Sequence, residues 1–565
     1  MKRSIPLLFL LALPSLAQNP PVILLNGYDV ATAGGGDCVV EPDSTGSFGR
    51  LEEFLRADGR EVLFFDNCTY GAPPIEELGQ HLGETIDALG VPQVDLVGIS
   101  MGGMIIRSYL AGKLPGGGFD PPLDPKVRKA VFLGTPNFGS PLADLPVGGD
   151  QIPEIRRGSR FVWDLATWNQ GTDDLREIDA LALAGSGQYD GRGDGSVGVS
   201  SASLLSFYGQ PVEKSRVIPA CHNDAAFILC STRVALAQVD SEEHPTAVAI
   251  RAFLADRPDW MSVGVPVPEH PATVGLADVL VELRDASDAL ITDASRPVVT
   301  LPGGETSTLD RGVAGLFYKQ DLPGALLPLT VDAGSAGTLS ASIEAGLGKT
   351  RLLPLSPGPR LIRAVPSAGL LSTLSLAPDS LASLFGSGFT DSEAAAEALP
   401  LPTQLAGVQV RFDDQPLELL YAGPGQVNVR IPAGALGLHT LTLESPLGVD
   451  AFNVFLEPAA PAVFTLDGSG TGAAAALNAQ TFELIAPATP IAAGDYAALY
   501  VTGIGDQEVE VILGGQPQTV SYFGPAPGFA GLQQVNFQVQ GASGSQELLI
   551  RAGGRFSNAA LLAIR

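Results

Sequence analysis

Positively charged residues are scarce in this chain of 565 residues. It contains 33 lysines and arginines against 61 aspartates and glutamates, so its formal net charge at pH 7 is −28. Nucleic-acid binding requires clusters of cationic side chains on the phosphates, and the sequence has no basic stripe. We therefore exclude nucleic acid as a partner. Attraction to anionic lipid head groups by charge alone is disfavoured for the same reason.

Apolar runs long enough to cross a membrane are also missing from the sequence, since a spanning helix needs roughly 18 such residues. Residues 5–13 form a short apolar run after Lys2 and Arg3, and Ser15-Leu16-Ala17 follows as a small-x-small cleavage site. This is the pattern of a secretory signal peptide over residues 1–17. We expect an exported protein without a transmembrane span, either secreted or at the cell surface.

Cysteine is rare, with 4 residues in the whole chain. An even number of cysteines in an exported protein favours disulfides, and their positions along the chain favour the pairs Cys38–Cys68 and Cys221–Cys230. The sequence contains no Cys-x-x-Cys and no clustered His/Cys spacing. We therefore predict no zinc-type metal site and no cofactor.

Alternation of short apolar runs with helical periodicity, from residue 21 to 257, is typical of a parallel α/β sheet. The expected strands are residues 22–26, 61–66, 94–99, 129–134, 180–184 and 216–219. The expected helices are residues 50–57, 75–89, 101–113 and 244–255. Six strands make a small α/β domain, which we place at residues 18–260.

The most informative motif is Gly98-Ile99-Ser100-Met101-Gly102, which ends an expected strand and opens an expected helix. It is the G-x-S-x-G strand-to-helix turn of the α/β-hydrolases, in which the neighbours two residues before and after the serine must lack side chains. The turn holds the serine hydroxyl at the carboxyl end of the sheet, beside the positive end of the helix. We predict Ser100 as a nucleophile and the Met101 amide as an oxyanion donor. The alternative is a chance glycine-rich turn.

A serine nucleophile needs a base, and in this fold the chain order is serine, acid, histidine. The chain has only 5 histidines, so there are few candidates for this base. His81 precedes the serine in an amphipathic helix pattern, and His270 and His439 fall in the β-rich region. His222 directly follows the last expected strand, whereas His244 opens the final helix and is better explained as a surface position there. We predict His222 as the base.

The acid should lie in the loop after residues 180–184, which offers Asp190 and Asp194. Asp194-Gly195-Ser196-Val197 resembles the Asp-Gly-x-Val element that holds the acid in bacterial lipases. We therefore favour Asp194 over Asp190. The alternative explanation of this loop is a calcium-binding or merely solvated acidic turn.

Taken together, residues 20–257 resemble the bacterial triacylglycerol lipases and related esterases. Gly134-Thr-Pro-Asn-Phe-Gly-Ser140 is similar to a Gly-Thr-Pro-His-x-Gly-Ser stretch of that family. Leu24-Leu25-Asn26-Gly27-Tyr28 resembles its His-Gly-x element, which implies the Tyr28 amide as the second oxyanion donor. Asn26 stands where the family has histidine, which should change the bracing of the loop more than the chemistry.

This resemblance implies a secreted bacterial enzyme that cleaves carboxylic esters, with lipid esters favoured, through an acyl-enzyme. A polyester depolymerase or an extracellular acyltransferase would use the same triad. Calcium braces some relatives, but the sequence assigns no ligands to it. Residues 138–178 form a long excursion with Phe161, Trp163 and Trp168 close together. It is either a lid that meets lipid or lines an acyl pocket, or ordinary packing.

Beyond residue 262 the helical periodicity nearly vanishes, and glycine and proline punctuate short β-type runs. Residues 263–355 resemble bacterial immunoglobulin-like repeats. Residues 360–458 and 459–565 form a duplication, in which residues 382–388 recur at 497–503 and residues 426–428 at 534–536. These two repeats resemble IPT/TIG-like modules of exported acidobacterial proteins.

The expected architecture is therefore an α/β-hydrolase domain followed by three all-β immunoglobulin-like sandwiches. Attachment to a cell surface or to an insoluble substrate is our hypothesis for the sandwiches. The rival interpretation is a non-catalytic surface adhesin with a relic hydrolase head.

Overall fold

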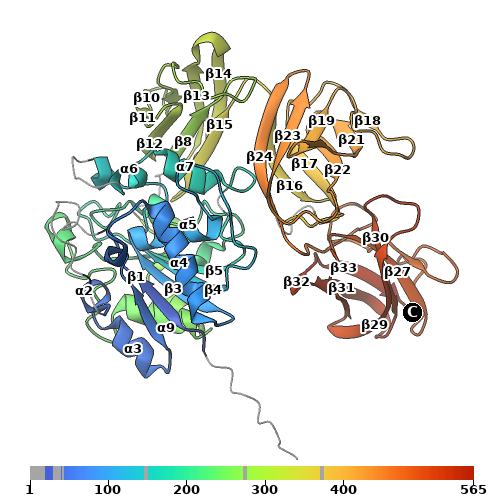
Figure 1. Ribbon diagram of the computed structural model, residues 1–565, viewed down its shortest axis with the longest axis horizontal. Helices are drawn as coiled ribbons and strands as arrows, with labels where there is room; N and C mark the ends of the chain where they lie inside the picture. The colour runs from blue at the N-terminus through green and yellow to red at the C-terminus, as the bar shows by residue number, and fades with distance from the viewer. Residues whose placement is uncertain are drawn as a thin grey trace, which may run out of the picture.

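The computed structural model describes residues 19–28, 40, 43–144, 151–172, 174–271, 277–369 and 375–565 (Figure 1). The expected signal peptide and Cys38 lie outside these described residues, so the pairing Cys38–Cys68 stays a prediction. Within the described residues, no helix combines the length and the apolarity that crossing a membrane would take.

The N-terminal part is a seven-stranded sheet in the order β2-β1-β3-β4-β5-β6-β7. Its strands are β1 (Val22–Leu25), β2 (Val62–Phe65), β3 (Val94–Ile99), β4 (Val127–Leu133), β5 (Asp179–Gly185), β6 (Ser215–Ile218) and β7 (Val265–Pro266). Strands β1 to β6 are paired in parallel and match the six expected strands, whereas β7 is antiparallel to β6. Strand β7 was not expected, because two residues are too few to show a periodicity.

Helices cover both faces of this sheet (Figure 1). They are α2 (Thr45–Phe48), α3 (Leu51–Ala57), α4 (Ile75–Leu89), α5 (Met101–Ala111), α6 (Ile152–Ile155), α7 (Arg160–Thr167), α8 (Val199–Ala202) and α9 (Pro245–Leu254). Short 3-10 turns are η1 (Asn67–Tyr70), η2 (Pro141–Asp144), η3 (Val212–Lys214), η4 (Asp224–Leu229), η5 (Pro258–Ser262) and η6 (Val267–Glu269).

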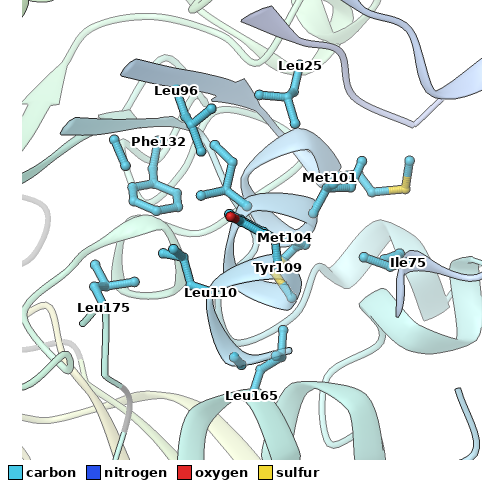
Figure 2. Close-up of a cluster of buried hydrophobic side chains, with 14 of the residues drawn as sticks. Leu25, Ile75, Leu96, Met101, Met104, Tyr109, Leu110, Phe132, Leu165 and Leu175 are labelled. Atoms are coloured by element: carbon cyan, nitrogen blue, oxygen red, sulfur yellow. The ribbon is translucent and has the colours of Figure 1, made fainter. Parts of the chain in front are cut away.

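Successive strand residues point to opposite faces of the sheet. Ile23 and Leu25 are buried with the apolar sides of α4 and α5, whereas Val22 and Leu24 are buried with α3 and α9. Figure 2 shows the first of these clusters, with side chains of α5 packed between the sheet and the excursion. Because both faces are covered, the strands are continuous apolar runs rather than alternating ones.

Three all-β regions follow, the first above the α/β domain in Figure 1 and the other two to its right. Each encloses its own buried apolar cluster, within residues 277–355, 361–456 and 459–564. The first consists of β8 (Ala277–Leu283), β9 (Val298–Thr300), β10 (Thr306–Thr308), β11 (Asp310–Arg311), β12 (Leu316–Leu322), β13 (Leu326–Asp332), β14 (Thr338–Glu344) and β15 (Thr350–Leu355), with the turn η7 (Gly334–Ala336). These strands form two four-stranded sheets, β10-β9-β13-β14 and β11-β12-β8-β15.

The second region has a five-stranded and a four-stranded sheet, and the third has one nine-stranded sheet. The second consists of β16 (Arg360–Pro366), β17 (Leu381–Ser387), β18 (Ala394–Ala395), β19 (Gln409–Phe412), β20 (Gln415–Pro416), β21 (Leu419–Gly423), β22 (Gln426–Arg430), β23 (Gly437–Ser445) and β24 (Gly448–Leu456). The third consists of β25 (Ala462–Val463), β26 (Ala476–Asn478), β27 (Tyr496–Thr502), β28 (Val509–Leu513), β29 (Gln516–Pro525), β30 (Gln533–Gln538), β31 (Gly544–Ala552), β32 (Arg555–Phe556) and β33 (Ala560–Ile564).

The duplication seen in the sequence recurs in the strand pairing of these two regions. Strand β17 pairs antiparallel with β22, and β27 pairs antiparallel with β30. Ala382 opposes Val429 in the first pair, and the corresponding Ala497 opposes Phe537 in the second. The repeated Gln-x-Asn motif even makes the same hydrogen bond at 2.8 Å, from Gln426 to Asn428 and from Gln534 to Asn536. The repeats therefore share a register as well as a sequence pattern.

The aromatic excursion is packed rather than exposed. Phe161, Trp163 and Trp168 are buried in the same cluster as Leu280 of the first β region and Phe455 of the second. The Trp168 and Phe455 rings meet edge to face, with their centroids 6.3 Å apart. These aromatic side chains therefore join the α/β domain to the β regions, which favours the packing explanation over a lipid-facing lid.

A buried ion pair strengthens this junction. Arg176 contacts Glu457 at 3.2 Å, and their side chains are 3% and 7% exposed. Arg555 of the third β region contacts the same carboxylate at 3.0 Å. Nearby, the Gln170 amide donates to the Asn453 carbonyl at 2.5 Å. The β regions thus pack against the α/β domain through buried polar and apolar contacts and are not merely connected to it by a linker.

Replacing Glu457 with alanine should lower the free energy of unfolding by about 3 kcal/mol, because it removes the carboxylate paired with the buried Arg176 charge. Thermal unfolding of the full chain measures this loss. The matched control is Glu510→Ala, whose partner Arg551 lies 3.3 Å away in a pair that is 45% and 57% exposed. Exposed pairs contribute about 0–1 kcal/mol. Equal shifts for the two variants would contradict a stabilising interdomain junction.

Candidate active site

Ser100 stands in a strained turn between β3 and α5. Its φ of 54° and ψ of −122° are unfavourable for a residue with a side chain, and such strain gathers at functional sites. Two hydrogen bonds hold the turn, from the Ser100 amide to the Leu133 carbonyl at 2.8 Å and from the Gly103 amide to the Ser100 carbonyl at 3.1 Å. The hydroxyl-bearing residue is therefore presented at the carboxyl end of the sheet.

The two glycines of the motif are required by space. A Cβ on Gly98 would lie 2.6 Å from the Gly102 carbonyl carbon, and a Cβ on Gly102 would lie 2.4 Å from the Leu25 carbonyl oxygen. Real Cβ atoms do not approach backbone atoms so closely, so any side chain would force strand and helix apart. This is the physical reason for small residues two positions before and after Ser100.

His222 and Asp194 meet although 28 residues separate them, with 2.7 Å between His222 Nδ1 and Asp194 Oδ2. Both side chains are buried. The other carboxylate oxygen, Oδ1, accepts hydrogen bonds from the amides of Ser196 at 2.8 Å and Val197 at 2.7 Å. The carboxylate is thus held against Nδ1, and a proton on Nδ1 would let that nitrogen donate to Asp194 and leave Nε2 as the acceptor.

Close packing behind this pair depends on Gly134. A Cβ there would lie 2.7 Å from Asp194 Oδ2 and 3.0 Å from His222 Nδ1. Its φ of 51° also favours glycine. Gly134 is the first residue of the Gly-Thr-Pro-Asn stretch singled out in the sequence, and it directly follows β4, next to the His222–Asp194 contact.

A disulfide closes the loop that carries His222. Cys221 and Cys230 are bonded, with their Cα atoms 6.2 Å apart, and η4 lies between them. The His222 amide donates to the Asp194 carbonyl at 2.9 Å, and the Leu236 amide donates to the Cys221 carbonyl at 2.8 Å. The imidazole is thus carried on a short, cross-linked and hydrogen-bonded segment.

The alternative acid and base lie elsewhere. Asp190 is on an exposed turn, where its carboxylate accepts the Arg192 amide at 3.0 Å. His244 caps α9 by accepting the Thr246 amide at 3.3 Å. The expected position at the start of the helix is thus confirmed, but the expected surface location is wrong, because His244 is only 7% exposed. Burial lowers the pKa of His244.

The expected oxyanion donors flank Ser100. Met101 is the first residue of α5, where helix amides have no partner within the helix. On the other side, a Cβ on Gly27 would lie 3.0 Å from Ser100 Cβ, so the turn after β1 that leads to Tyr28 packs directly against the serine. The Asn26 side chain donates to Asp66 at 3.2 Å and accepts from the Asn67 amide at 3.0 Å. Asn26 therefore braces this turn.

Ser100, His222 and Tyr28 all line one cavity of about 680 Å³. Its other walls are largely apolar and come from η2, α6 and the disulfide loop, including Ile152 and Ile155. Phe161, Trp163 and Trp168 are not among its lining residues. Among the described residues of the excursion, those that line this cavity lie between residues 140 and 155. Sequence reasoning missed Ile152 and Ile155 because α6 is a single turn without a detectable period.

Among the described residues, no group of three or more His, Cys, Asp and Glu side chains is placed to hold a metal ion.

At the level of sequence, no family model and no curated protein matches the chain. Among solved structures, phospholipase PlaB from Legionella pneumophila is 13% identical with a TM-score of 0.44, covering 61% of this chain and 94% of that one. Bacillus licheniformis lipase BlEst2 in its propeptide form is 12% identical with a TM-score of 0.29, covering 78% and 93%. An extracellular α/β-hydrolase from a Paenibacillus species is 21% identical with a TM-score of 0.15, covering 22% and 46%. Likenesses at this level define neither activity nor substrate.

A pair of acidic side chains, Glu154 of α6 and Glu76 of α4, lies where α6 meets the start of α4. The Ile75 amide donates to Glu154 at 2.9 Å, and the Glu154 carboxyl also contacts that of Glu76, which is 8% exposed. Burial and the hydrogen bond to Glu76 together raise the pKa of Glu154 to about 9. Lys113, which is paired with Asp164 at 3.3 Å, opposes this rise only in part. A pKa raised in this direction favours one shared proton between the two carboxyls over two negative charges in the folded protein.

This pair should make stability depend on pH. Because the pKa of Glu154 is raised from 4.5 to about 9, the contribution of the pair is fully present below pH 4.5 and is lost as the pH rises toward about 9. The neutral variant Glu154→Gln should melt at a higher temperature than wild type at pH 9 and near the wild-type temperature at pH 4.5. Melting curves across this range test it. Glu77→Gln, one residue along α4, is the control and should give no such gain. A constant difference between Glu154→Gln and wild type at every pH would contradict the shared proton.

Proposed function

We propose that this protein is an exported serine hydrolase of the α/β-hydrolase type that cleaves carboxylic esters through an acyl-enzyme. The observation that supports this best is that Ser100 and His222 line one cavity while Asp194 contacts Nδ1 of the His222 imidazole at 2.7 Å. Strain at Ser100 and burial of the His222–Asp194 pair both cost stability, and function is the usual reason for retaining such features. This argues against a relic head on a surface adhesin.

The proposed reaction has two steps. His222 Nε2 takes the proton of the Ser100 hydroxyl as its oxygen attacks the ester carbonyl carbon, and Asp194 stabilises the imidazolium. The amides of Met101 and Tyr28 donate to the oxyanion. The tetrahedral intermediate collapses, the carbon–oxygen bond to the alcohol breaks, and His222 returns the proton to the leaving alkoxide. Water then attacks the acyl-enzyme along the same route and releases the acid.

Lipid esters are the favoured substrates, because the apolar walls of the cavity suit an acyl chain. A polyester depolymerase or an extracellular acyltransferase would use the same residues and differ in what enters the cavity. Export is supported by the Cys221–Cys230 disulfide, since disulfides persist in oxidising compartments, and by the signal-like residues 1–17. Attachment to a cell surface or insoluble substrate remains our proposal for the three C-terminal β regions.

Hydrolysis of p-nitrophenyl octanoate by the full chain tests the proposal. Ser100→Ala should lower kcat by about 10⁴-fold or more, because the nucleophile is lost. Asp194→Asn should lower it by about 10⁴-fold, because the imidazole is left in the wrong tautomer. Ser241→Ala and Asp240→Asn, substitutions in the loop before α9, are the controls and should retain wild-type rates. A wild-type protein without activity, or a Ser100→Ala variant with full activity, would overturn the proposal and favour the adhesin.

A further inference from the structure

A second cavity, of about 310 Å³, lies between the α/β domain and the first β region. It shares part of its lining with the cavity at Ser100, namely Leu142, residues 195–197 and Leu229. Gln320 and Asp321 of β12 line only the second cavity. The two spaces are therefore neighbours with a common wall, and the first β region contributes the outer side of the second one.

The common wall lies on the histidine side of the proposed catalytic centre. Residues 196 and 197 donate the amides that hold Asp194, and Leu229 belongs to the disulfide loop that begins with Cys221 and His222. The oxyanion donors Met101 and Tyr28 line no part of the second cavity. In the proposed mechanism His222 protonates the departing alcohol, so the alcohol leaves on the histidine side. The second cavity is thus next to the alcohol portion of the ester.

The second cavity is built by contacts that join both domains. Asp278, buried at the start of β8, accepts a hydrogen bond from the Ser200 hydroxyl at 2.5 Å and another from the Asp321 amide at 3.1 Å. Strand β12 has an irregular register between Lys319 and Leu322, and Asp321 has a φ of 59°. Such bulges re-aim side chains and are frequent beside active sites. Arg192 reaches Asp321 across the boundary at 3.3 Å.

Its lining mixes donors and acceptors of both charges. Arg192 supplies a guanidinium, Asp190 and Asp321 supply carboxylates, and Gln188 and Ser200 supply an amide and a hydroxyl. Two carboxylates disfavour a phosphate group, and the guanidinium disfavours a quaternary ammonium. Hydroxyl groups both donate and accept hydrogen bonds, so several of them can be satisfied by such a mixture. By contrast, the cavity at Ser100 has mainly apolar walls beyond its catalytic residues.

We propose that the second cavity is a subsite for a neutral polyhydroxylated alcohol, and that the substrates are fatty-acid esters of a sugar or sugar alcohol. The acyl chain occupies the apolar cavity at Ser100, and the hydroxyl groups of the alcohol bind to the paired side chains of Arg192 and Asp321 where these line the second cavity. The first β region is then part of the substrate-binding surface. This inference rests on the ester hydrolase activity proposed above.

Three esters with the same acyl chain test the subsite on the purified full chain: 6-O-octanoyl glucose, methyl octanoate and octanoylcholine. We expect kcat/KM for the glucose ester to exceed that for methyl octanoate by about tenfold or more, mainly through a lower KM. Arg192→Gln and Asp321→Asn should each reduce this ratio about three- to tenfold, as expected for loss of one hydrogen-bonding group. Their ion pair is half exposed, so both variants should fold. Glu344→Gln, on the exposed side of β14, is the control and should leave the ratio unchanged.

Equal kcat/KM for the glucose and methyl esters would overturn the subsite while leaving the ester hydrolase intact. Preference for octanoylcholine would overturn the polyol and favour a cationic alcohol. Equal losses on all three esters in the Arg192 and Asp321 variants would assign these residues a structural role and overturn the subsite as well. No hydrolysis of any of the three esters, nor of p-nitrophenyl octanoate, would instead count against the proposed function itself.

Discussion

The site depends on the close approach of β3, α5 and the turn after β1 around Ser100. There is no room for a Cβ at Gly98 or Gly102, since backbone atoms would lie within 2.6 Å of it. This contact forces the serine into its strained conformation and brings the Gly27 turn against its Cβ. The surrounding sheet is buried on both faces, and the free energy of this packing offsets the cost of the strained turn.

A second constraint acts on the other side of the cavity. Asp194 is held by two amides, His222 is carried on a disulfide-closed loop, and Gly134 leaves room for both beneath β4. The Asp194 carboxylate and the loop that carries His222 therefore have little conformational freedom. The imidazole therefore keeps its orientation without needing a bound substrate, as the base of the proposed mechanism must.

The β regions are more closely integrated than their repeat-like sequences indicate. The buried Arg176–Glu457 pair and the contact of Trp168 with Phe455 join the second region to the α/β domain, and the Asp278 carboxylate joins the first. These contacts explain why the excursion at residues 138–178 is rich in aromatic residues. Its large side chains fill the space between domains, while its short helix α6 forms a wall of the cavity.

The sequence by itself determined the strands and helices around Ser100, because a buried parallel strand and an amphipathic helix have distinct periods, and because Gly-x-Ser-x-Gly allows one kind of turn. The six parallel strands and helix α4 could be read almost to the residue for this reason. The repeated motifs in the last two β regions likewise predicted a duplication, and the structure adds that the two copies share a strand register.

Only the tertiary structure decided which segments that are distant in the sequence come into contact. It brought Asp194 rather than Asp190 to His222, buried His244, and turned the aromatic excursion toward the β regions. It also formed β7, the wall made by Ile152 and Ile155, and the second cavity beside Asp321. None of these features has a local period or motif. They follow from which surfaces meet when the chain folds, and that depends on shape and burial across the whole molecule rather than on neighbours in the sequence.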